Sequence, residues 1–146
     1  MANFDSSVAQ QIAHAALAFQ HEGTGHEPHS VAVVLSGDTL LITLHGALSP
    51  AEMALAQSPA GAAQVREFHR QLFISSADEL RQEIRRITGV EVREAMAEVA
   101  TSGSVAQVFT TGTMVQVFLL AQGVPAGSWS GNGLGESSQK TEVLPC

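Results

Sequence analysis

The clearest hydrophobic pattern in the chain is a pair of β-type runs at residues 30–36 and 39–45, separated by Gly37-Asp38. A two-residue Gly-Asp connection favours a tight hairpin. If Ser36 pairs with Thr39, six apolar side chains share one face, because alternate residues of a strand point the same way: Val31, Val33, Leu35, Leu40, Ile42 and Leu44. The opposite face carries Ala32, Val34, Leu41 and Thr43. It is also rather apolar, so we expect it to meet a helix or another subunit.

Helical periodicity predicts a first helix from about residue 7 to residue 22. Asp5, Ser6 or Ser7 can cap its start, and Gly23 is expected to end it. Its apolar stripe is Val8, Ile12, Ala15 and Phe19.

Two further helices are predicted from their caps. Ser49-Pro-Ala-Glu52 is a capping box with proline at the first helical position, and it opens a short helix to about Gln57. Ser58-Pro59 opens a long helix that runs to Thr88 and stops at Gly89. Ser75-Ser76 interrupts its stripe, which predicts a kink or a polar contact there. The expected stripe is Val65, Phe68, Leu72, Leu80, Ile84 and Ile87.

The pattern returns to β type after Gly89, with runs at 90–100, 105–110 and 114–120. From Gly123 the composition changes to Gly, Ser, Pro and Asn, which predicts a flexible tail over 123–146 with Trp129 as its one anchor candidate. The expected fold is therefore a single α+β domain over residues 1–122. Its antiparallel sheet has four to five strands, the N-terminal hairpin plus C-terminal strands, packed against an N-terminal helix and a long central helix.

Composition narrows the class of protein. With 45% apolar and 14% charged residues, the chain is not disordered overall, and self-association is the simplest way to cover its apolar surface. A net charge of −7, without a single-sign basic stripe, argues against nucleic-acid binding and against attachment to an anionic membrane. No stretch approaches the length of a membrane span, so no direct membrane insertion is expected. The lone cysteine, Cys146, excludes a disulfide framework within the chain and fits a cytoplasmic location.

The first candidate site is the segment around His21, His26 and His29, with Glu22 and Glu27 between them. Two histidines and a carboxylate can bind a metal ion. However, these residues surround a glycine loop and lack the helical spacing that would bring them together, so a solvated loop is the favoured interpretation.

The remaining candidates do not assemble into an active site. His14, His45 and His69 are each expected to be surface or hydrogen-bonded histidines. Ser49 and Ser58 already serve as caps. Gly131-Asn-Gly133-Leu-Gly135 has neither the preceding strand nor the following helix of a phosphate-binding loop. We therefore expect no catalytic, cofactor or metal residues, and a protein that is not an enzyme.

One segment resembles a known family. Residues 46–56, Gly-Ala-Leu-Ser-Pro-Ala-Glu-Met-Ala-Leu-Ala, are similar to a motif of the bacterial MpsC-like family. Residues 23–28, 65–72 and 87–92 agree with the same family in order and spacing, so the resemblance covers roughly residues 10–110. The chain departs from the family pattern in its low charge and in its extra β run, and either 105–110 or 114–120 can be the last family strand.

The resemblance implies a small accessory component of a membrane system that generates membrane potential by cation translocation and is related to inorganic-carbon uptake. It carries over no catalytic residues. The first functional hypothesis is thus a non-enzymatic cytoplasmic interaction domain that forms a homodimer and serves such a transporter. The alternative is a small-ligand or metal-binding sensor that uses the His21–His29 loop.

Overall fold

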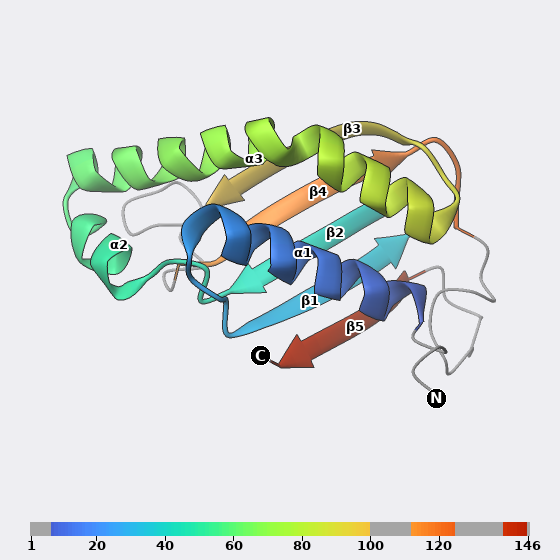
Figure 1. Ribbon diagram of the computed structural model, residues 1–146, viewed down its shortest axis with the longest axis horizontal. Coiled ribbons are helices and arrows are strands. Elements are labelled where there is room, and N and C mark those ends of the chain that lie inside the picture. The colour runs from blue at the N-terminus through green and yellow to red at the C-terminus, as the bar shows by residue number, and fades with distance from the viewer. Residues whose placement is uncertain (1–6, 100–111, 125–138, 146) are drawn as a thin grey trace.

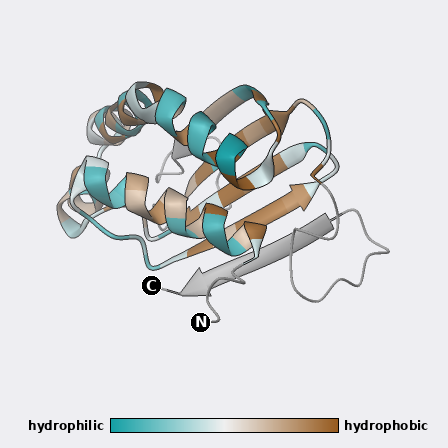
Figure 2. Cartoon of the chain, turned by 45° about the vertical axis from the view of Figure 1, so that its right-hand side comes forward, coloured by the Kyte–Doolittle hydropathy of each residue, from teal (hydrophilic) through white to brown (hydrophobic). Residues whose placement is uncertain are grey.

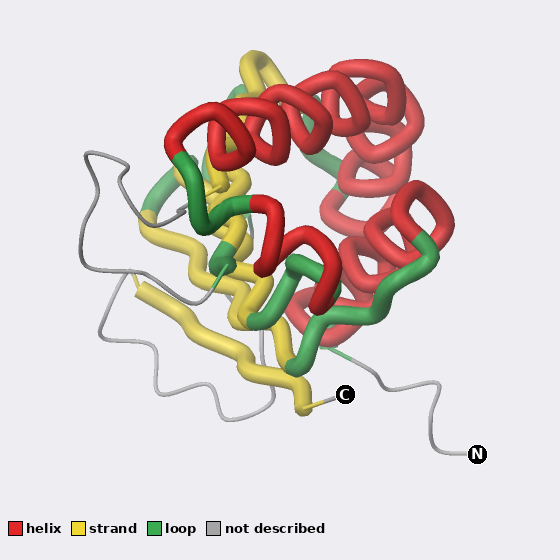
Figure 3. The backbone as a smooth tube through the Cα atoms, turned by 90° about the vertical axis from the view of Figure 1, so that its left-hand side faces the viewer, coloured by secondary structure: helices red, strands yellow, loops and turns green. Residues whose placement is uncertain are grey.

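The computed structural model describes residues 7–99, 112–124 and 139–145, and it has two layers (Figure 1). Helices α1 (Val8–Thr24) and α3 (Pro59–Thr88) lie on one face of a sheet, as the side-on view in Figure 3 shows. A short helix, α2 (Pro50–Leu55), precedes α3. The strands are β1 (Ser30–Ser36), β2 (Thr39–His45), β3 (Val92–Val99), β4 (Met114–Leu120) and β5 (Gln139–Pro145). The predicted α+β class and its two main helices are confirmed.

The register of the β1–β2 hairpin is the predicted one. Ser36 pairs with Thr39, and the three predicted apolar pairs follow along the ladder. All six inward side chains are at most 4% exposed. Gly37 opens the turn with φ of +62°, which glycine adopts without the steric penalty that other residues meet. Turn chemistry and alternation therefore specify the same register.

The described strands form one antiparallel sheet in the order β3-β4-β2-β1-β5. The 114–120 run is β4, and it lies between β2 and β3. The 105–110 run lies outside the described residues, so the structure leaves open which run is the last family strand.

Residues 139–145 differ from the flexible tail expected from composition. They form β5, which pairs with β1 along its whole length, from Ser30–Pro145 to Ser36–Gln139. The reason is backbone chemistry: the outer edge of β1 presents N–H and C=O groups that need partners, and β5 supplies them. The proposed anchor Trp129 and the Gly131–Gly135 loop lie outside the described residues.

Helix α1 starts as predicted but ends later. The hydroxyl of Ser7 accepts a hydrogen bond from the Gln10 backbone N–H at 3.1 Å. Gly23 is still helical, because the left-handed residue that ends the helix is Gly25, with φ of +75°. The buried face consists mainly of small residues, which let the helix lie close to the sheet: Val8, Ala9, Ile12, Ala13, Ala16 and Gln20. The predicted stripe members Ala15 and Phe19 are only partly buried.

Helix α3 has the predicted limits, from its Ser58 cap to Gly89, but a different buried face. Phe68 is 46% exposed, and His69 and Phe73 are buried in place of Phe68 and Leu72. The true stripe passes through residues 65, 69, 73, 80 and 84, which share one side of a helix at 3.6 residues per turn. At the predicted interruption, the hydroxyls of Ser75 and Ser76 donate to the carbonyl of Leu72, so the polar contacts stay within the helix.

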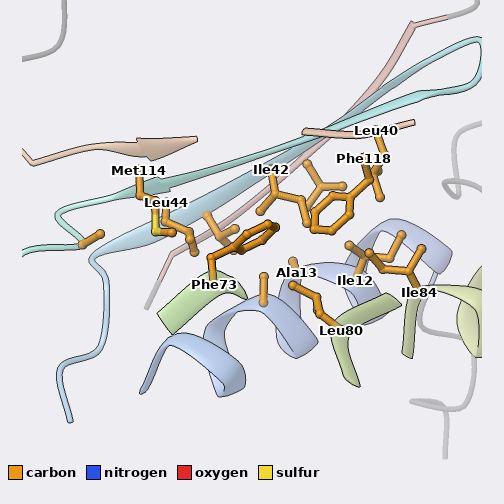
Figure 4. Packing of buried hydrophobic residues seen from close by; sticks show 14 of the residues in the cluster. Ile12, Ala13, Leu40, Ile42, Leu44, Phe73, Leu80, Ile84, Met114 and Phe118 are labelled. Carbon is orange, nitrogen blue, oxygen red and sulfur yellow. The ribbon is translucent and has the colours of Figure 1, made fainter. Parts of the chain in front are cut away.

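The core lies between the two helices and the sheet. Figure 4 shows Ile12 and Ala13 of α1 facing the strands, with Phe73, Leu80 and Ile84 of α3 beside them. The rings of Phe73 and Phe118 are 5.9 Å apart between centroids. In Figure 2 the helices are hydrophilic mainly on their outer side. Burial of each large apolar side chain contributes about 1.5–3 kcal/mol, so this layer supplies most of the stability.

The connection between α2 and α3 depends on a close backbone approach. A Cβ atom built on Gly61 would lie 1.8 Å from the carbonyl oxygen of Leu55. Glycine at this position therefore lets the first turn of α3 pack on the end of α2. That packing brings Glu52 of α2 beside α3.

Candidate functional site

A chain of buried and partly buried polar side chains connects all three helices. Glu52 Oε1 accepts from the backbone N–H of Ser49 at 2.9 Å, and the Ser49 hydroxyl accepts from the Glu52 N–H, which completes the predicted capping box. The second carboxylate oxygen, Glu52 Oε2, lies 2.9 Å from Nε2 of His69. On the other side of the imidazole, Nδ1 lies 3.3 Å from Nε2 of Gln20 in α1.

These contacts assign a hydrogen-bonding role to each nitrogen of the imidazole. Since a carboxylate only accepts, His69 Nε2 carries the hydrogen and donates to Glu52. Nδ1 then accepts from the Gln20 amide. His69 is 0% exposed, and a buried polar group without partners would cost roughly 1–3 kcal/mol. Both ring nitrogens are engaged, so His69 is held as a hydrogen-bonded histidine, one of the two roles expected for it.

Gln116 lies on the same inner side of the sheet, in β4. Inward positions of this strand alternate as Met114, Gln116, Phe118 and Leu120, so the amide is placed in the core layer. Its side chain is 4% exposed, and its Oε1 atom is buried without a hydrogen-bond partner. Among the side chains described, this is the one buried oxygen or nitrogen atom left in that condition.

A cavity of about 160 Å³ separates Gln116 from the two helices. Its apolar wall comes from Phe19, Leu72, Phe73, Leu80 and Met114. Gln20, His69 and Gln116 supply buried polar groups, and Glu22 and Glu79, both exposed residues, also line it. The cavity exists because α1 packs mainly over β1 and β5 while α3 packs over β3, which leaves β4 less closely covered.

A second concave surface lies on the other side of α3, along strand β3. This groove encloses about 530 Å³. Ile74 and Met96 are 58% and 56% exposed there, which is high for side chains of their size and apolarity. Its other lining residues are Arg70, Phe73, Ala77, Asp78, Arg81, Ala95 and Ala97. We call this surface the α3/β3 groove.

The histidine loop predicted as a metal site does not gather its side chains. His26 Nε2 lies 3.0 Å from the Gly46 carbonyl oxygen, and the His29 ring packs against the backbone of Gly46. His21 is exposed in the last turn of α1. Within residues 7–99, 112–124 and 139–145, no three histidine, cysteine or acidic side chains lie where they could share a metal ion. The loop's contacts are those of a chain reversal between α1 and β1.

The other sequence candidates have separate positions. His14 is exposed on α1, and His45 is partly buried at the end of β2. Ser58 caps α3 through a 3.0 Å contact to the Gly61 N–H. Cys146 lies outside the described residues.

Perturbed pKa values occur on the outer surface of α3, away from the cavity. Hydrogen bonds from Gln71 and the charge of Arg70 hold the pKa of Glu67 below its ordinary value. The Arg86 guanidinium does the same for Glu83, and this carboxylate raises the pKa of Arg86 in return. These pairs are exposed, so they mark a solvated helix face.

Sequence reasoning missed the polar residues of the cavity, although signals for two of them were present. Gln116 lies two residues from both Met114 and Phe118, so it points to the same face of the strand. His69 lies four residues from both Val65 and Phe73, so it shares their side of the helix. Glu52 was identified as a cap, but its second contact, to His69, depends on how α2 packs on α3. Gln20 lay within the predicted first helix, but the predicted stripe ran through Ala15 and Phe19, whereas the buried face runs through Ala16 and Gln20.

Among the described residues, no helix combines the length and apolarity needed to cross a membrane. No curated protein and no solved structure matches the chain. A family model described as "Na+-translocating membrane potential-generating system (MpsC)" matches residues 5–122. Since this match covers most of the sequence, and includes the Ser49–Glu52 motif whose capping box the structure contains, the chain belongs to the MpsC family.

Proposed function

We propose that this chain is a non-catalytic accessory subunit of a Na⁺-translocating, membrane-potential-generating system. In this proposal it joins the system by binding an extended segment of a partner subunit at the α3/β3 groove. The observation that carries the proposal is the outer edge of β3, with which no described strand pairs, beside an apolar groove. The family description supplies the membrane system.

Strand β3 supplies the backbone half of the proposed contact. It is the last strand on its side of the sheet, and no described strand pairs with its outer edge. Within the described part of the chain, its N–H and C=O groups on that edge have no strand partner, and an added strand would supply one. Recognition by strand addition derives affinity from such main-chain hydrogen bonds, whereas neighbouring pockets select the side chains.

The groove supplies the side-chain half. Ala95 and Ala97 face α3 and leave room beside β3 because their side chains are small, and Ile74 presents apolar surface at the border. Met96 borders the groove at the strand, but its side chain shares the opposite face of the sheet with its ladder partner Val117. Two arginines and one aspartate also line it, which favours a segment with alternating apolar residues and an acidic residue. Arg70 already pairs with Glu67, so Arg81 is the better placed cation for such an acid.

Binding to the membrane subunits of the system from the same host tests the proposal. We expect the detergent-solubilised subunits to bind the immobilised wild-type chain in biolayer interferometry. Ile74→Asp should weaken binding at least about tenfold, because a charge in an apolar contact costs more than 1.4 kcal/mol. Leu55→Asp is the matched control, since Leu55 is 48% exposed on α2 and does not line the groove.

Two results would overturn the proposal: no binding by the wild-type chain, or equal binding by the Ile74→Asp variant and the wild type. Labelling the methionine methyl groups gives a second readout, because Met96 lines the groove whereas Met53 does not. A bound partner segment should shift the Met96 signal in a ¹H–¹³C spectrum.

The homodimer expected from the doubly apolar hairpin is a separate proposal. No described helix covers the second face of the sheet, where Val34, Leu41 and Val117 lie on adjacent strands. We expect light scattering to give twice the mass of one chain, 15.3 kDa. Leu41→Lys should shift the protein to that single-chain mass. If the wild-type protein stays at the single-chain mass at high concentration, the dimer proposal is refuted and the groove proposal is unaffected.

A further inference from the structure

We propose that the cavity between α1, α3 and β4 is a binding site for a small organic ammonium ion with a compact apolar body. Its central feature is Gln116, which is only 4% exposed and whose amide oxygen Oε1 has no hydrogen-bond partner. A native protein rarely leaves such an atom unsatisfied, and each case requires an explanation. An occupant that donates a hydrogen bond supplies one.

The polarity of the cavity selects the charge of the occupant. The group without a partner is a carbonyl oxygen, which accepts, so the occupant must be a donor. Glu22 and Glu79 line the same cavity, and the described lining contains neither lysine nor arginine. A cation is therefore favoured over a neutral donor, and a carboxylate is disfavoured twice, by charge and by its lack of a hydrogen to donate.

The size and walls of the cavity select the body of the occupant. A dry engineered cavity of about 150 Å³ in another protein accepts benzene, and this cavity has a similar volume of about 160 Å³. Phe19, Leu72 and Phe73 contribute apolar wall, so a ring or branched alkyl group would replace water with favourable contact. Oε1 is itself buried, so contact with the occupant requires the amide to turn about its terminal torsion, which is soft and brings the oxygen to the cavity.

The neighbouring polar groups are already engaged. His69 and Gln20 bond to one another, and His69 also bonds to Glu52. These contacts hold the cavity wall in place while Gln116 remains free to bind. The site is separate from the α3/β3 groove, which lies on the other side of α3, and the two share one lining residue, Phe73.

Three probes of nearly equal shape test the inference: benzylamine, benzamide and benzoate. The chain has four methionines, and Met114 lines the cavity whereas Met96 lines the groove. With ¹³C-methyl-methionine protein, we expect benzylammonium to shift the Met114 signal saturably and to leave Met96 unchanged. Benzamide should bind at least about fivefold more weakly, and benzoate should not bind. At about ten times its dissociation constant, benzylammonium should raise Tm by roughly 3–5 °C.

Substitutions assign the contacts. Gln116→Met, which removes the acceptor and keeps the volume, should weaken benzylammonium binding at least about tenfold. Glu79→Gln should weaken the binding of benzylammonium and leave the binding of benzamide unchanged. Glu27→Gln is the control, because Glu27 is an exposed carboxylate near α1 that does not line the cavity. The inference is overturned if benzylammonium leaves Met114 unchanged, if benzoate binds equally well, or if Gln116→Met binds like the wild type.

Discussion

Replacement of Gln116 by methionine should stabilise this protein, although it changes a buried residue of the central sheet. The wild-type amide has a buried Oε1 without a partner, and an unsatisfied buried group costs roughly 1–3 kcal/mol. Methionine has nearly the same length and volume, and volume-conserving core replacements usually cost less than about 1.5 kcal/mol. We expect the free energy of unfolding to rise by about 1–2 kcal/mol.

Gln20→Met provides the matched comparison across the same cavity. Gln20 is also buried, but its amide lies 3.3 Å from Nδ1 of His69. The same substitution there leaves the imidazole nitrogen buried without a donor, which should lower the free energy of unfolding by about 1–2 kcal/mol. The two variants should therefore change the free energy of unfolding in opposite directions, although both replace glutamine by methionine.

Urea denaturation followed by circular dichroism measures both changes, with thermal unfolding as a check. In a domain of this size, 1 kcal/mol corresponds to about 3 °C in Tm. Gln116→Met should thus melt roughly 3–6 °C above the wild type, and Gln20→Met should melt below it. If both variants lose stability to a similar extent, Gln116 makes a stabilising contact that the geometry lacks, and the reasoning about its oxygen is refuted.

Three further perturbations address the rest of the fold. Glu52→Ala removes a capping partner and the acceptor of His69, so urea unfolding should show a loss of about 2–4 kcal/mol; a loss below 1 kcal/mol would contradict the shared role. Gly61→Ala places a Cβ against a backbone carbonyl of α2, so we expect a loss of more than about 3 kcal/mol, against about 1 kcal/mol or less for the neighbouring Ala60→Gly. Arg86 holds the pKa of Glu83 below its ordinary value, so this pair stabilises above about pH 4.5 and the contribution disappears as the pH falls through the lower folded-state pKa. Glu83→Gln should therefore lose less stability than the wild type on acidification from pH 5 to pH 3, and parallel curves would count against the pair.

The hairpin and the helix caps were predictable because their determinants are local. The Gly37-Asp38 turn and the alternation around it define one register, and Ser7, Ser49, Ser58 and Gly89 act within a few residues of their partners. Such signals need no knowledge of the tertiary structure. They also explain why the most diagnostic family segment is visible from its residues alone.

The buried side of α3 was less predictable because tertiary packing decides it. Both Phe68 and His69 fit a helical stripe through Val65, and hydrophobicity favours Phe68. The structure buries His69 because Glu52 and Gln20 reach it from two other helices, and this compensates the cost of burying an imidazole. Strand β5 was missed for a related reason: its polar residues carry little pattern, and its partner edge lies far away in the sequence.

The pairing of β5 with β1 has a consequence for the order of events during synthesis. Strand β1 leaves the ribosome early, whereas β5 follows only after every other described element. Until then the outer edge of the hairpin stays open beside six of the most apolar side chains in the chain, and such edges recruit other nascent strands. Long-range pairings also form slowly, since a large loop must close before any hydrogen bond is gained. The interval before β5 docks is therefore the stage at which the β1 edge is most exposed to pairing with a wrong strand.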